Sequence, residues 1–156
     1  MGAESYLEEL WGVVKRYRGL VRPREVGLPR PVPLVTPDEE ALGAVRELGL
    51  KACMVEYHQL PPLKGDPHAE LGFDGQILLS AVMPDEMLED PSTFRGFVEA
   101  ARRGFDAVVG WDAPVEVDIP EEESWRILVA CLELTARLAL ELDAPVVPLS
   151  KGASEE

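Results

Sequence analysis

The sequence predicts one α/β domain, a mainly parallel five-stranded sheet with helices on both faces, preceded by an N-terminal amphipathic helix. Two observations predict this fold. Short segments that are apolar on both faces alternate with segments of helical periodicity, as in parallel sheets covered by their connecting helices. The chain has 156 residues, the length of one ordinary domain. Two topologies fit this pattern, an open flavodoxin-like sheet and half of a (β/α) barrel.

The N-terminal region differs from the rest of the chain. Leu7, Trp11 and Val14 recur at three- and four-residue spacing, which predicts an amphipathic helix over residues 5–21. Prolines interrupt the next stretch, so it is neither a helix nor a central strand. The chain therefore divides into an N-terminal helix with a proline-rich linker at 1–31, an α/β domain at 32–150 and a flexible tail at 151–156.

From residue 32 onward, strand and helix patterns alternate. The first helix has a clear start signal, since Thr36 can cap it, Pro37 suits its first turn and Glu39 stands three residues after the cap. A long irregular loop, rich in proline and glycine, is predicted at 58–75. The predicted strands occupy residues 32–35, 52–57, 76–83, 106–111 and 144–149. The predicted helices occupy residues 36–48, 92–103 and 120–142.

The last predicted helix is apolar around most of its circumference. Its polar positions fall close to one stripe, at Glu133, Arg137 and Glu141 among others. One sheet face cannot cover so much apolar surface. Either the N-terminal helix packs over it or a second subunit does. We therefore expect a homo-oligomer, most simply a homodimer, with the N-terminal helix as a further contact surface for a protein partner.

The net charge of −14 is spread unevenly along the chain. Residues 1–30 carry six basic and four acidic side chains, whereas the remainder carries nine basic and 25 acidic ones. An acidic body repels phosphate backbones, so we expect no nucleic-acid binding by the main domain. Under a weaker alternative, the basic N-terminal helix contacts RNA or DNA, and that binding would weaken strongly with salt.

The expected location is the cytoplasm, with no contact to a membrane. Cys53 and Cys131 lie inside apolar runs, where buried free thiols are the expected state, and that state suits a reducing compartment. Acidic residues occupy the N-terminus, where a secretory signal would be basic. The longest apolar region, 127–142, contains charged residues and cannot span a bilayer. Many prolines with few Asn or Gln resemble thermophile compositions.

The first candidate site is the edge where the second predicted strand ends. Ligands of parallel sheets bind beyond the carboxyl ends of the strands, and long loops in small domains are often functional. His58 is a candidate acid–base residue because histidine titrates near neutral pH. Glu56, Lys64 and His68 are candidate ligand-binding residues. The ten-residue spacing of the histidines matches no familiar metal-site pattern.

The second candidate site follows the fourth predicted strand. Asp112 stands at the end of that strand, where a carboxylate can bind a metal, a ribose or an amine. Asp85 and Glu86 follow the neighbouring strand and could complete a site for a divalent metal with Asp112. Trp111 is a candidate ligand-stacking residue. In the competing interpretation, Trp111 belongs to the core and Asp112 caps a turn.

Two functions remain open at this stage. The favoured one is a self-associating protein that binds a ligand or a partner, or is a subunit of a complex. It rests on the apolar last helix, the amphipathic N-terminal helix and the uneven charge. The alternative is a metal-assisted hydrolase or lyase in which Asp112 holds a divalent metal and His58 is the acid or base. The sequence lacks the glycine-rich phosphate loops, the HExxH motif and the GxSxG motif.

Overall fold

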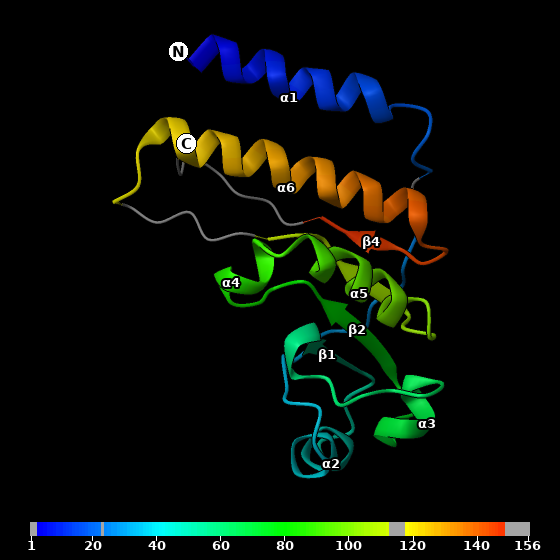
Figure 1. Ribbon diagram of the computed structural model, residues 1–156. Coiled ribbons are helices and arrows are strands. Elements are labelled where there is room, and N and C mark those ends of the chain that lie inside the picture. Colours follow the sequence, from blue (N-terminus) through cyan, green and yellow to red (C-terminus); the bar gives the residue numbers. More distant parts are fainter. Residues whose placement is uncertain (1–2, 23, 113–117, 149–156) are drawn as a thin grey trace.

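A computed structural model describes residues 3–22, 24–112 and 118–148 of the chain (Figure 1). Part of the last predicted strand and the whole predicted tail lie outside these residues. The strands are β1 (Ala52–Glu56), β2 (Gln76–Ser80), β3 (Ala107–Val109) and β4 (Val146–Val147). The helices are α1 (Ala3–Tyr17), α2 (Glu39–Glu47), the 3-10 turn η1 (Tyr57–Gln59), α3 (Pro67–Leu71), α4 (Asp85–Leu88), α5 (Pro91–Ala101) and α6 (Glu121–Glu141).

The strands form one parallel sheet in the order β1-β2-β3-β4. In the described part of the chain, the sheet has four strands and not the predicted five, because the strand predicted at 32–35 makes only a single parallel bridge, between Leu34 and Met54. Pro33 accepts a hydrogen bond from Met54 there but has no N–H to donate, so the ladder does not extend. The strands follow one another in sequence order, and the flavodoxin-like strand order is not observed.

The helices of the core cover one face of the sheet. Cys53, Ile77 and Val108 point to that face and share a cluster with residues of α2, α5 and α6. The prediction of helices on both faces is therefore wrong. Parallel strands joined in sequence order by right-handed crossovers place every connecting helix on the same side.

The opposite face of the sheet is covered by the segment predicted as a linker. Leu78, Ala107 and Val109 are buried on this face, and Val26 and Leu28 of the proline-rich segment pack against them. An extended segment can cover a narrow sheet face because its alternate side chains point the same way. The segment thus belongs to the packing of the sheet.

Helix α1 forms an outer layer beyond α6 (Figure 1). Val13 is buried between them, and the Arg16 and Tyr17 side chains both donate hydrogen bonds to Glu133 of α6. The predicted packing of the N-terminal helix over the last helix is thus present within one chain.

Both cysteines are free and buried, as predicted. Among the described residues, no helix is both long and apolar enough to cross a membrane.

Local signals explain the helix boundaries that differ from prediction. Asp38, rather than Thr36, caps α2, and its carboxylate accepts the Ala41 N–H at 2.8 Å. Thr36 instead donates its hydroxyl hydrogen to Asp38. The predicted irregular loop 58–75 contains most of η1 and all of α3, and the predicted strand 76–83 ends at Ser80, before α4.

Candidate functional site

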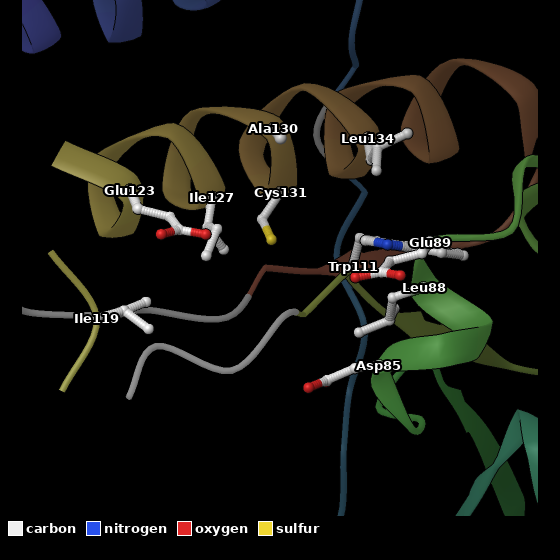
Figure 2. Close-up of a pocket in the computed structure, with 10 residues that line it drawn as sticks. All are labelled: Asp85, Leu88, Glu89, Trp111, Ile119, Glu123, Ile127, Ala130, Cys131 and Leu134. Carbon is white, nitrogen blue, oxygen red and sulfur yellow. The ribbon is translucent and has the colours of Figure 1, made fainter. Parts of the chain in front are cut away.

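A cavity of about 420 Å³ opens at the carboxyl edge of the sheet, between α4, the end of β3 and the first half of α6 (Figure 2). We call it the carboxyl-edge cavity. Figure 2 shows Glu123, Ile127 and Cys131 pointing from α6 towards the space, with Asp85 on the opposite side. Its lining residues are Asp85, Leu88, Glu89, Trp111, Ile119, Glu123, Ile127, Ala130, Cys131 and Leu134.

Trp111 forms a fixed wall of this cavity. Its indole ring is buried and lies 5.4 Å from the ring of Phe94 and 5.7 Å from the ring of Phe97. Its backbone N–H donates to Oγ1 of Thr135 on α6 at 3.0 Å. Helix α6 can approach the end of β3 closely because Gly110 lacks a side chain. A Cβ at Gly110 would lie 2.7 Å from Cγ2 of Thr135. Trp111 is therefore a core residue that also lines a cavity, and its role in ligand stacking stays a prediction.

Among the described residues that line the cavity, those that carry a charge are all acidic. Asp85 opens α4, Glu89 is the C-cap of α4, and Glu123 lies in the first turn of α6. Acidic residues suit the first turn of a helix because they complement its dipole. The remaining lining residues are apolar apart from the Cys131 thiol. The cavity therefore combines an apolar floor with a negative rim.

The three proposed metal ligands are not assembled into a metal site. Within the part of the chain that the structure describes, no group of three or more His, Cys, Asp or Glu residues converges. Asp85 lines the carboxyl-edge cavity, whereas Glu86 does not. Asp112 is half-buried beside Trp111 and is likewise not among the lining residues.

His58 and Glu56 lie together at the end of β1. Nε2 of His58 is 3.6 Å from Oε2 of Glu56, and both side chains are largely buried. Nδ1 of His58 is buried and has no hydrogen-bond partner among the residues that the structure describes. His58 lines a second cavity of about 400 Å³ with Tyr57, Glu99 and Arg103 among its lining residues. Burial, and secondarily the charge of Glu99, raise the pKa of Tyr57 above its ordinary value.

His68 lies at the other edge of the sheet, away from both cavities. Its Nε2 is 2.7 Å from Oδ2 of Asp106, which precedes β3 and also accepts the N–H of Ile77 near the start of β2. Its Nδ1 is 3.1 Å from Asp66, the N-cap of α3. The structure therefore does not bring His58 and His68 together.

The electrostatics of His68 follow from these contacts. Burial lowers its pKa, but the hydrogen bonds and charges of Asp106 and Asp66 outweigh burial and leave the pKa above its ordinary value. Lys64 lies in the segment 57–75 that connects β1 to β2, which we call the return segment. Its backbone N–H donates to the carboxylate of Glu70, and its side chain is exposed.

The sequence interpretation missed most of the cavity. Glu89 caps a short helix that the sequence pattern does not predict, and the pattern does not distinguish Glu123 from the other residues of the helix predicted at 120–142. The pattern places Ile127 and Cys131 in an apolar helix but does not show which part of the protein they face. Their four-residue spacing was the available signal, because it places both residues, with Glu123, on one face of α6.

Comparisons of the chain with models of protein families, with curated proteins and with solved structures found no match. The fold and the cavity therefore define only a class, a parallel α/β domain with an acidic, apolar-floored cavity at the carboxyl edge of its sheet.

Proposed function

We propose that the protein is a binding protein that takes a small organic cation with an apolar body into the carboxyl-edge cavity. The single observation that carries this proposal is the lining of the cavity, where the described residues provide an apolar floor and three carboxylates but no basic side chain. Cavities of about 300–1,000 Å³ are typical of small-molecule sites. The volume of about 420 Å³ falls in that range.

The floor supports the apolar part of the ligand. Leu88, Ile127 and Leu134 contribute aliphatic surface, and the Trp111 ring is fixed by its aromatic neighbours. Each methylene group that leaves water for such a surface contributes about 0.8 kcal/mol. A fixed ring also loses little conformational freedom when a ligand packs on it.

The rim supports the positive charge of the ligand. A cation about 5 Å from one carboxylate gains roughly 3 kcal/mol at an effective dielectric constant of about 20, before its desolvation is counted. The carboxylates of Asp85, Glu89 and Glu123 all attract a cation in the cavity. The net charge of −14 adds a long-range attraction for cations and a repulsion for anions.

Binding without catalysis is the simpler account of these residues. A metal-assisted hydrolase or lyase needs Asp112 to share a metal with Asp85 or Glu86, and these residues form no ligand group within the described chain. It also needs His58 near that metal, whereas His58 lines the second cavity.

The parallel strands, which are ordered as in the sequence, support a proposal about the fold as well. The sheet has the topology of half a (β/α) barrel.

Three probes of similar shape and different charge test the proposal. Phenethylammonium, 2-phenylethanol and 3-phenylpropionate are titrated into the full chain by isothermal calorimetry. We expect the cation to bind most tightly and the anion not to bind, with cation affinity falling as salt is added. Equal binding of all three probes, or binding of the anion alone, would contradict the proposal.

Glu122 supplies a matched control for Glu123. Glu122→Gln removes the same charge from the same helical turn, but the Glu122 side chain bonds Arg126 at 2.7 Å and does not line the cavity. We expect Glu123→Gln to weaken phenethylammonium binding about three- to fivefold, as for a partly exposed charge pair. Glu122→Gln should leave the affinity within twofold of the wild-type value.

A further inference from the structure

The outer face of α1 carries an exposed apolar stripe. Leu7, Trp11 and Val14 are 48%, 58% and 39% exposed, and we call these three residues the outer stripe. Their spacing of four and three residues places them on one side of the helix. The side that faces α6 is defined by Val13, which is buried, and Tyr17, which bonds Glu133. The outer stripe lies roughly a quarter to a third of a turn round the helix from that side, so it flanks the contact with α6 and stays exposed, and α1 is the outermost layer in Figure 1.

We propose that the outer stripe pairs with the outer stripe of a second copy of this chain, with the two α1 helices antiparallel about a two-fold axis. In such a pair, Leu7 of each copy lies opposite Val14 of the other, and the two Trp11 residues meet near the centre. Tryptophan is enriched at protein interfaces because it buries a large area. A protein surface leaves few such side chains exposed in a row without a use.

The charges beside the outer stripe favour this orientation. Glu8 and Lys15 are both exposed and stand seven residues apart, so they lie on the same side of α1. The midpoint between them falls beside Trp11. An antiparallel pair then sets each Glu8 opposite the Lys15 of the other copy, twice by symmetry. In a parallel pair, the flank that carries Glu8 and Lys15 would face the opposite flank of the partner helix, so this attraction between Glu8 and Lys15 would be lost.

A second copy fits the stripe better than a membrane does. An amphipathic helix bound to an anionic bilayer needs an excess of basic residues on its polar face. Helix α1 has no such excess, because over Ala3–Tyr17 it carries three glutamates against two basic residues, Lys15 and Arg16. The whole chain has a net charge of −14, which an anionic surface repels.

The expected dimer is weak, because one pair of short helices buries less than a standard interface. None of the outer-stripe residues lines the carboxyl-edge cavity, so this pairing goes beyond the proposed ligand binding and can fail independently of it. Sedimentation of the full chain from about 1 to 500 μM should show a monomer–dimer equilibrium with a dissociation constant in the micromolar range. Trp11→Ala should weaken it at least tenfold. Leu48→Ala, at a 74%-exposed leucine remote from α1, should leave it unchanged.

Charge reversal tests the orientation. Glu8→Lys and Lys15→Glu should each weaken the homodimer, because each sets like charges opposite one another. Combining both changes in one chain should restore it, and mixing the two single variants should give a heterodimer. All substituted positions are exposed, and circular dichroism checks that each variant is folded.

Three outcomes would overturn the proposal. The first is a monomer across the whole concentration range. The second is a dimer that is insensitive to Trp11→Ala or is not restored by the double charge reversal. The third is α1-dependent binding of the monomer to vesicles containing phosphatidylserine, with no dimer in solution.

Discussion

The imidazole of His68 joins the starts of two strands to α3, because its Nε2 lies 2.7 Å from the Asp106 carboxylate that also accepts the Ile77 N–H. This contact holds the return segment of the chain against the amino edge of the sheet. His68 does not line the carboxyl-edge cavity, which lies at the opposite edge of the sheet. His68 is thus positioned to stabilise the fold, and its protonation should be visible in stability.

The raised pKa of His68 gives a signed pH dependence. A folded-state pKa above the ordinary value of 6.5 means that the folded chain binds the proton more tightly than the unfolded chain. The stabilisation is therefore fully present below pH 6.5 and is lost as the pH rises through the folded-state pKa. We expect urea denaturation to give a lower stability at pH 8.5 than at pH 6. In His68→Gln this difference should shrink, and an unchanged difference would refute the assignment.

Gly96 should be intolerant of any side chain. A Cβ at this position of α5 would lie 2.5 Å from Oη of Tyr57, a contact that real structures do not contain. We expect Gly96→Ala to destabilise the protein by about 1–3 kcal/mol through overpacking. Tyr57→Phe in the Gly96→Ala background should recover much of this loss by removing the hydroxyl.

Gly43 provides the matched control for Gly96. It lies in α2, and a Cβ there would meet only the end of the flexible Arg46 side chain, at 3.7 Å. Gly43→Ala should stabilise the helix by about 0.5–1 kcal/mol, because alanine loses less backbone entropy than glycine. Destabilisation by both substitutions would show that contact distance does not explain the Gly96 effect.

The hydrogen bond from the Trp111 backbone to Thr135 can be tested directly. Thr135→Val keeps the shape of the side chain but removes Oγ1, which accepts the Trp111 N–H at 3.0 Å. A buried donor left without a partner costs about 1–3 kcal/mol. We expect a loss of stability in that range by thermal or urea denaturation. A neutral substitution would show that this bond does not hold the cavity wall.

The proline-rich segment should contribute to stability. Leu28 is half-buried against Leu78, Ala107 and Val109 on the face of the sheet without helices. We expect Leu28→Ala to cost about 1–2 kcal/mol, less than the roughly 2–5 kcal/mol for a fully buried leucine. Leu48→Ala, at an exposed position, should change stability by less than about 0.5 kcal/mol. Equal effects of the two substitutions would mean that the segment is only a linker.

The sequence pattern predicted the parallel α/β class because apolar runs such as Cys53–Val55 and Ala107–Val109 are short and continuous. It could not show that the prolines at 31 and 33 would limit an edge strand to one bridge. It also could not fix strand order, which depends on contacts between distant segments. The single-sided helix layer follows from that order and was therefore missed.

The candidate site was predicted only in part, for a related reason. Trp111 was placed correctly at the carboxyl edge because it directly follows a strand. His68 was grouped with His58 because both lie in one connecting segment. A segment between parallel strands must run from the carboxyl edge back to the amino edge, so its later residues belong to the far side. The Asp66-Pro67 start and the Gly72 end of α3 were local signals of that return.

The central claim is that the carboxyl-edge cavity binds an organic cation. The most direct test is a titration of the methyl-labelled chain with phenethylammonium, followed by NMR. The account predicts saturable shifts concentrated at the methyl groups of Leu88, Ile119, Ile127 and Leu134, with none at Leu34 or Leu48. Shifts at Leu60 and Leu63 of the second cavity instead, or no saturable shift anywhere, would contradict it.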